Sequence, residues 1–401
     1  MSANPGPPKP EGLSRRAFLM AVAAALMPSC SRSGTDNGSG YRVWGGNGFR
    51  DGLFVRPRAI CANQGEVFVI DMTGRVQVFT EAGEFLRCWT LPESENGTPT
   101  GLTFGRNGNL LIPDTHYSRI LEYTRNGEFV STWGSYGTDQ PGTVTKRPAA
   151  ADADRVSPGR SPSGPMAGGD GTTMLPNAGN GIRNTAPRSG DESGAAVDGR
   201  LPENHSDRRD DVRFVYPTGI AQSPDGLLYV SEYGMGAEQV RVFDATRRPV
   251  HQWGNHGQAP GQFNRAMALA FDDTAGVFVA DTANHRVQRF DPDGKLLAVI
   301  GTPGTAPGQL KFPHGLAIAP DGTVLVVEYG THRVSQFSVD GNFIACHGGP
   351  GREPGRFNGP RGISVSAGGT AFVADTDNHR VQRFDYRAAG SHDQAAGTRS
   401  Q

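Results

Sequence analysis

A stretch of about a dozen residues recurs three times near the end of the 401-residue chain, almost letter for letter. The copies cover residues 279–290, 326–337 and 373–384, and their acidic residues, Asp281, Glu328 and Asp375, are 47 positions apart. A constant period of this length is typical of solenoids and propellers. The chain is therefore predicted to be a repeat protein.

Weaker copies place the same acid at Asp71, Asp114 and Glu232, which makes six units. Each unit holds four short apolar runs with alternating polarity, separated by turns of the Asp-Gly type. Such alternation and such turns predict antiparallel hairpins. Six units of four strands predict an all-β fold, a six-bladed β-propeller.

The two ends of the chain are expected to close the ring. Residues 41–45 are similar to the fourth strands of other blades, although no strands precede them, and the last blade stops after its third strand at 380–385. A shared sixth blade removes an open sheet edge. Residues 41–142 then form the closing strand and blades one and two, residues 212–386 form blades three to six, and residues 387–401 are a disordered tail.

The motifs Asn284-His285-Arg286-Val287 and Asn378-His379-Arg380-Val381, each with an upstream Ala-Asp-Thr, resemble NHL repeats. The resemblance covers residues 41–386 apart from one insertion and is weakest in blade one, which lacks the Asn-His pair. It implies a six-bladed propeller. It does not imply an activity, because this fold hosts binding modules and enzymes alike.

The N-terminus resembles an export signal. Arg15 and Arg16 are followed by an apolar run over residues 17–27 that is too short to span a membrane, as in twin-arginine signals. Residues 26–30 resemble a lipobox, although Met27 stands where leucine is usual. We interpret residues 1–30 as a signal peptide with lipidation at Cys30, and residues 31–40 as a flexible tether. This predicts a lipoprotein on the periplasmic side of a bacterial membrane, exported already folded; the alternative is a soluble periplasmic or secreted protein.

Residues 143–211 form an insertion rich in Pro, Gly, Ser, Ala, Asp and Arg. This composition cannot form a core, and the segment is predicted to be disordered. It joins the last strand of blade two to the first strand of blade three, on the face where propeller ligands usually enter. It is either a tolerated loop expansion or a lid or docking arm.

Composition and the repeats limit the possible chemistry. The formal net charge is −1 and no basic stripe is present, which argues against nucleic-acid binding. His285, His332 and His379 recur in register, so they should lie apart around the ring and bond within or between blades rather than hold a metal. No metal site or cofactor is predicted, and a structural or channel cation is left open. Cys61, Cys88 and Cys346 are predicted to be buried thiols without a disulfide.

Residues that break the repeat are better candidates for a site. Each blade presents one residue where its innermost strand begins, at the mouth of the channel: Arg58, Thr100, Thr218, Met267, His314 and Arg361. Blades five, six and one are neighbours, so His314, Arg361 and Arg58 should form a basic sector opposite a neutral one. Tyr233 and Tyr329 stand just after the acid, where other blades carry Thr or Met. This combination suits an anionic or carboxylate-bearing ligand; the alternative is a solvated rim with incidental charge.

The competing hypothesis is that the protein is an enzyme, because related propellers include enzymes. Pro313-His314-Gly315 resembles the zinc-binding motif of peptidyl-hydroxyglycine amidating lyases, but the equivalent positions in the other blades hold Arg, Thr and Met, so no zinc cage is expected. Lactonase-like chemistry needs carboxylates facing the channel, whereas the acids here all follow the repeat. The sequence therefore favours a monomeric binding or scaffold module for an envelope protein or a small anionic ligand, over a lyase or hydrolase that uses the same mouth.

Overall fold

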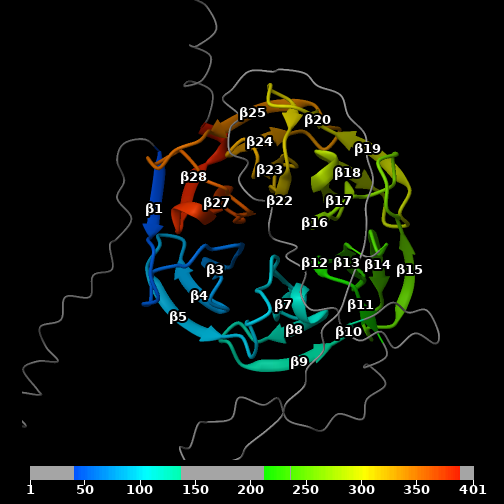
Figure 1. Ribbon diagram of the computed structural model, residues 1–401, viewed down its shortest axis with the longest axis horizontal. Helices are drawn as coiled ribbons and strands as arrows, with labels where there is room; N and C mark the ends of the chain where they lie inside the picture. The colour runs from blue at the N-terminus through cyan, green and yellow to red at the C-terminus, as the bar shows by residue number, and fades with distance from the viewer. Residues whose placement is uncertain (1–39, 137–211, 235, 389–401) are drawn as a thin grey trace, which may run out of the picture.

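The computed structural model describes residues 40–136, 212–234 and 236–388, and these form a ring of six four-stranded antiparallel sheets (Figure 1). The predicted six-bladed β-propeller is confirmed. Counted outward from the axis, blades one to three consist of β2 (Ala59–Asn63), β3 (Glu66–Ile70), β4 (Arg75–Thr80) and β5 (Phe85–Thr90); β6 (Thr103–Phe104), β7 (Leu110–Asp114), β8 (Arg119–Tyr123) and β9 (Phe129–Trp133); β12 (Pro217–Gln222), β13 (Leu228–Glu232), β14 (Gln239–Phe243) and β15 (Pro249–Trp253). Blades four to six consist of β16 (Ala266–Asp272), β17 (Gly276–Asp281), β18 (Arg286–Phe290) and β19 (Leu296–Ile300); β22 (Pro313–Ile318), β23 (Val324–Glu328), β24 (Arg333–Phe337) and β25 (Phe343–Gly348); β26 (Gly362–Val365), β27 (Thr370–Asp375), β28 (Arg380–Asp385) and β1 (Tyr41–Gly45).

The ring is closed by the N-terminal strand, as the sequence predicts. β1 pairs antiparallel with β28, with Tyr41 opposite Phe384 and Gly45 opposite Arg380. A short 3-10 turn, η5 (Tyr386–Ala388), follows β28. Arg387, which the sequence assigned to the tail, donates through Nε to the Asp321 carboxylate of blade five at 3.0 Å. The described chain therefore ends on the neighbouring blade.

The core of the propeller lies between the blades. Six clusters of buried apolar side chains each join two neighbouring sheets, and one of them packs Phe68 of blade one against Leu110 and Leu121 of blade two. The middle strands are buried on both faces; all five residues of β23, for example, are buried. Each large apolar side chain buried in this way contributes about 1.5–3 kcal/mol. The blades therefore hold one another in place, and the ring is rigid where its inner strands meet.

The connectors between blades share one geometry. Between blades four and five, β20 (Thr302–Pro303) pairs in parallel with β21 (Gln309–Leu310), so that the loop between them is pinched at its base. Between blades two and three, β10 (Ser135–Tyr136) pairs in the same way with β11 (Arg213–Phe214). The insertion therefore replaces the tip of an ordinary connector loop. Residues 143–211, predicted to be disordered, lie outside the described residues.

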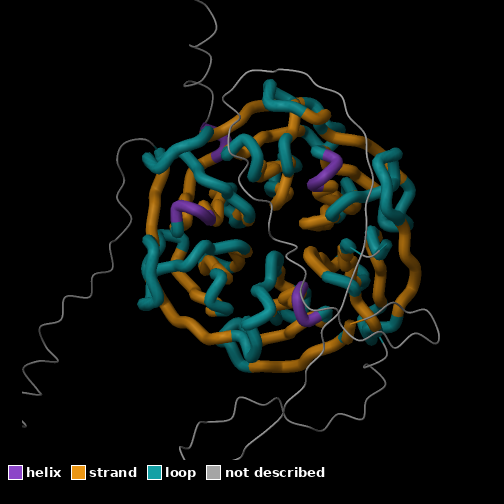
Figure 2. The backbone as a smooth tube through the Cα atoms, viewed as in Figure 1, coloured by secondary structure: helices purple, strands orange, loops and turns teal. Residues whose placement is uncertain are grey.

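One face of the ring carries both the starts of the inner strands and the turns after the repeated acids; we call it the mouth face. Ala266, which begins β16, lies opposite Asp281 at the end of β17, and Pro313 lies opposite Glu328 in the same register. The 3-10 turns after the acids are η1 (Thr115–Tyr117), η3 (Thr282–Asn284) and η4 (Thr376–Asn378), and they surround the axis in Figure 2.

The N-terminal predictions fall on residues whose structure is not described. The predicted signal peptide over 1–30, with Arg15, Arg16 and Cys30, and all but the last residue of the tether lie outside the described ranges. In residues 40–136, 212–234 and 236–388, no helix is long and apolar enough to cross a membrane.

Candidate ligand-binding site

The inner strands approach one another so closely that the residue after each mouth position has to be small. A Cβ atom on Gly315 would lie 2.3 Å from the carbonyl oxygen of Arg361, and one on Gly362 would lie 2.6 Å from the carbonyl oxygen of Arg58. Both distances are far below van der Waals contact. This backbone packing locks the strands that carry His314, Arg361 and Arg58 against each other.

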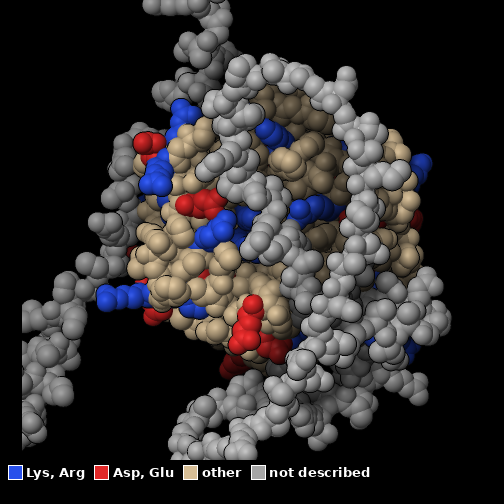
Figure 3. All heavy atoms as spheres, in the orientation of Figure 1, with Lys and Arg blue, Asp and Glu red and all other residues tan. Residues whose placement is uncertain are grey.

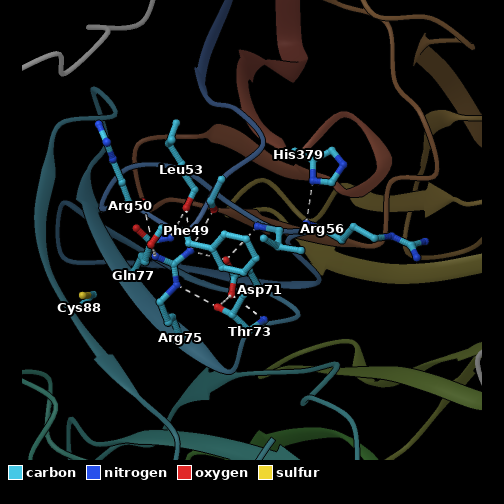
Figure 4. A network of polar contacts seen from close by, with 12 residues as sticks. Phe49, Arg50, Leu53, Arg56, Asp71, Thr73, Arg75, Gln77, Cys88 and His379 are labelled. Carbon is cyan, nitrogen blue, oxygen red and sulfur yellow. Dashed lines mark hydrogen bonds and ion pairs between the residues drawn. The ribbon is translucent and has the colours of Figure 1, made fainter. Parts of the chain in front are cut away.

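The repeated acids hold the connectors. In blade one, shown in Figure 4, Asp71 accepts the backbone N–H of Val55 at 3.0 Å and pairs with Arg75 at 2.9 Å. Arg75 in turn donates to the carbonyl oxygen of Leu53 in the same connector at 3.0 Å. The acid in blade one therefore fastens the connector to the blade. The same acid–arginine pair occurs as Asp114 with Arg119, Asp281 with Arg286, Glu328 with Arg333, and Asp375 with Arg380.

The repeated histidines bond between blades, as predicted. Nδ1 of His285 accepts the backbone N–H of Phe312 at 3.0 Å, and Nδ1 of His332 accepts that of Gly359 at 2.8 Å. His379 accepts in the same way from blade one at 3.1 Å. Burial lowers the pKa of both His285 and His332, which keeps these acceptors neutral.

Blade three departs from this pattern and brings an arginine to the mouth. Glu238 stands in place of the histidine and accepts the backbone N–H of Arg265 at 2.8 Å. Arg265 has a φ of 62°, the left-handed conformation, two residues before Met267. Its guanidinium lies 5.5 Å from the centroid of the Tyr233 ring, and Tyr216 packs against the same ring at 5.5 Å.

Three of the predicted site residues meet at the boundary of blades five and six. Nη1 of Arg361 lies 3.4 Å from Nε2 of His314, and the guanidinium lies 5.1 Å from the centroid of the Tyr329 ring. Tyr329 in blade five is equivalent in position to Thr282 in blade four. The Thr282 hydroxyl donates a hydrogen bond to the carbonyl oxygen of Pro313 at 2.6 Å. His314 is 9% and Arg361 7% exposed, so these two side chains are not a solvated rim.

These residues share a pocket of about 60 Å³ on the mouth face. Of the five predicted ligand-binding residues, His314, Arg361 and Tyr329 line it. Arg58 is buried in blade one and does not line the pocket. Tyr233 contacts the Arg265 guanidinium through its ring and does not line the pocket either. Lys and Arg side chains gather near the centre of the ring in Figure 3. The complete lining is Arg265, Met267, Thr282, Ala283, Phe312, His314, Tyr329 and Arg361.

Arg265 was missed by the sequence analysis, and it makes the expectation of a neutral sector wrong at blade four. The equivalent positions in the other blades hold Arg56, Thr98, Tyr216, Phe312 and Gly359, so only blades one and four carry an arginine there. Comparing the blades two residues before the mouth position would have found it.

Metal-binding groups and reactive cysteines are the other kinds of site considered among the described residues. No group of three or more His, Cys, Asp or Glu side chains in these residues is placed to hold a metal ion. Cys61, Cys88 and Cys346 are free thiols, and burial raises the pKa of Cys61 to about 12. Cys88 is exposed, because it faces outward on the outer strand β5, so the prediction of a buried thiol is wrong there. Partial burial and then Asp51 raise the pKa of the Cys88 thiol, which argues against a reactive thiolate.

Sequence comparison finds NHL repeats in the last two blades. Residues 310–337 and 357–384 match the NHL repeat. The first segment runs from the last residue of β21 to the end of β24, and the second ends in β28. No curated protein sequence matches the chain significantly. The protein is thus a six-bladed propeller in which the NHL signal is strongest in blades five and six.

Solved structures with a similar shape are propellers of diverse description. A protein of unknown function from Bacteroides thetaiotaomicron is 12% identical, with a TM-score of 0.54 over 86% of this chain and 76% of its own. A streptogramin B lyase is 11% identical, with a TM-score of 0.49 over 86% and 97%. An auxiliary nutrient binding protein from Bacteroides thetaiotaomicron is 12% identical, with a TM-score of 0.49 over 82% and 69%. At these identities the likeness shows the fold alone.

Proposed function

We propose that the protein is an exported, lipid-anchored NHL propeller that acts as a monomeric binding module for a carboxylate-bearing ligand at its mouth. The observation that carries the proposal is the convergence of Arg361, His314 and Tyr329 on one pocket. A guanidinium offers two parallel N–H donors to a carboxylate. Apolar walls with a few placed polar groups are the usual composition of a small-molecule site.

The position of Arg361 favours binding of an anion. The Tyr329 ring and the neighbouring His314 hold the guanidinium in place, so little side-chain entropy remains to be lost when a ligand binds. Partial burial excludes water from the ion pair and strengthens it relative to an exposed pair. The ligand is a small molecule or, alternatively, an acidic group displayed by an envelope protein.

A lyase or hydrolase that uses the same mouth is the alternative. The repeated acids, such as Asp281 and Glu328, are bound to the connectors. Among the described residues that line the pocket, His314 and Tyr329 can transfer a proton, but no carboxylate accompanies them. Acid–base catalysis usually needs a positioned pair of such groups. The geometry therefore supports binding better than catalysis.

The test is calorimetric titration of the purified full-length protein with short mono- and dicarboxylates. Arg361→Met removes the charge and retains the bulk, and we expect it to weaken binding at least about tenfold, equivalent to about 1.4 kcal/mol. Arg352→Met is the matched control, because Arg352 is exposed in the connector that leads into the same blade. If no carboxylate binds, or if Arg361→Met binds like the control, the proposed function is wrong.

A further inference from the structure

Three of the side chains that line the mouth pocket are apolar: Met267 and Ala283 of blade four and Phe312 of blade five. The proposed function assigns roles to lining residues of blades five and six only. The guanidinium of Arg265 stacks on the ring of Tyr233, which is not part of the lining. The apolar side chains therefore decide how much room remains in the pocket beside a bound carboxylate.

Met267 is the apolar member of the six mouth residues, and it is buried. It lies at a β-bulge between Ala266 and Ala268, and His314 lies at the equivalent bulge of blade five. A bulge leaves one residue out of the ladder and redirects its side chain. The same backbone feature thus directs both side chains into the pocket, and the residue type at the bulge determines what each contributes there.

Phe312 is held in place by the neighbouring blade, whereas Met267 is adaptable. The ring of Phe312 meets that of His285 edge to face, with the ring centroids 4.4 Å apart, and its backbone N–H donates to Nδ1 of His285 at 3.0 Å. A methionine side chain is unbranched, has three rotatable bonds and fills irregular gaps. The size of the pocket is therefore set by Met267 rather than by Phe312.

The volume of the pocket limits the part of a ligand that it can enclose. A water-sized group needs at least about 10–15 Å³ and occupies about 30 Å³ in a liquid. The pocket of about 60 Å³ therefore holds roughly two to six such groups. Acetate, with four non-hydrogen atoms, and propionate, with five, lie within this range, whereas valerate, with seven, exceeds it.

We propose that the pocket selects short monocarboxylates of the size of acetate and propionate, and that Met267 is the specificity-determining residue that limits their length. This inference rests on the proposed function, which supplies the carboxylate site, and adds the size class of the ligand. The methyl end of the ligand packs against Met267 and Phe312. Each methylene group that is buried there increases affinity about fourfold, and a chain that exceeds the room overpacks the pocket.

The experiment is calorimetric titration of the full-length protein at pH 7.5 with formate, acetate, propionate, butyrate and valerate, in a buffer without carboxylates. A ligand with four non-hydrogen atoms binds no more tightly than about 40 μM, so the titrations use millimolar ligand. Affinity should peak at acetate or propionate, and valerate should bind at least about fivefold more weakly than the best ligand. Affinity that rises steadily through valerate would overturn the size limit and leave carboxylate binding intact.

Met267→Ala removes three non-hydrogen atoms from the wall of the pocket, and the tightest ligand should become longer by about two carbon atoms. Met72→Ala is the matched control, because Met72 is exposed in blade one and is not part of the lining. An unchanged length optimum in the Met267→Ala protein would overturn the role of Met267. The series on the unmodified protein tests the size limit even if this variant does not fold.

Acetamide separates a failure of the size limit from a failure of the proposed function. It has the size and shape of acetate without the charge, and we expect it to bind at least about tenfold more weakly. Equal binding of acetamide and acetate, or no binding of any carboxylate, would reject the proposed function. Equal binding of all five carboxylates would reject only the selection by size.

Discussion

Substitution of Gly315 by alanine tests whether the inner strands pack as closely as the structure indicates. The new Cβ would lie 2.3 Å from the carbonyl oxygen of Arg361, which is backbone and cannot rotate away. Overpacking of this kind costs about 1–3 kcal/mol. Alanine also lowers the conformational entropy of the unfolded chain relative to glycine, which stabilises the folded protein by about 0.4–1 kcal/mol. The net loss is at most about 2.6 kcal/mol and centres on about 1.3 kcal/mol, which should lower Tm by about 3–5 °C at roughly 2–4 °C per kcal/mol.

The assay is thermal unfolding followed by circular dichroism, together with titration of the tightest carboxylate. Because β22 and β26 must move apart, the distance between His314 and Arg361 should increase and affinity should fall with stability. Gly368→Ala is the control, since its Cβ would meet only the Ser366 hydroxyl oxygen at 3.8 Å. A Gly315→Ala protein that is as stable as the Gly368→Ala protein would refute the argument.

Three further predictions concern the ring and its anchor. Burial lowers the pKa of His285 and His332, and that of His347 from 6.5 to about 4, so these histidines contribute stability above about pH 6.5 that is lost as the pH falls toward 4. The free energy of unfolding, measured with urea at pH 8, 6 and 5, should therefore fall with pH, and a flat profile would contradict this. Deletion of residues 41–45 removes the buried Trp44 and exposes the edge of β28, so limited proteolysis should cleave blade six first, whereas deletion of residues 31–35 should have no such effect. Cys30→Ala should move the protein from the membrane fraction to the soluble fraction, and unchanged fractionation would exclude lipid anchoring through this residue.

The architecture was predictable because every repeat carries the same pattern of apolar residues and turns and therefore folds in the same way. A period of 47 residues with alternating apolar positions allows few folds, and the incomplete units at the two ends have one simple solution, the pairing of β1 with β28. The structural role of His285 and its equivalents follows from the same reasoning. Each of these histidines accepts a backbone N–H from the connector of the next blade, so the three stay apart around the ring.

The site was only partly predictable, for a local reason. His314, Arg361 and Tyr329 replace residues that the repeat prefers, and such breaks are visible in a single sequence. Arg265 lies in the connector before β16, at a position that is left-handed in blades one and three to six, so strand alternation does not describe where its side chain lies. Arg58 was expected at the same site, but the pocket spans blades four to six, and Arg58 belongs to the blade beyond.

The pairing of β1 with β28 has a consequence for the order of folding. Among the described strands β1 comes first in the sequence and its partner β28 comes last, so blade six cannot be completed before the strands of the five other blades have been synthesised. Contacts between such distant parts of a chain form slowly, because a long loop must be closed before they contribute any stability. A chain truncated before β28 therefore cannot close the ring, because β1 has no partner strand.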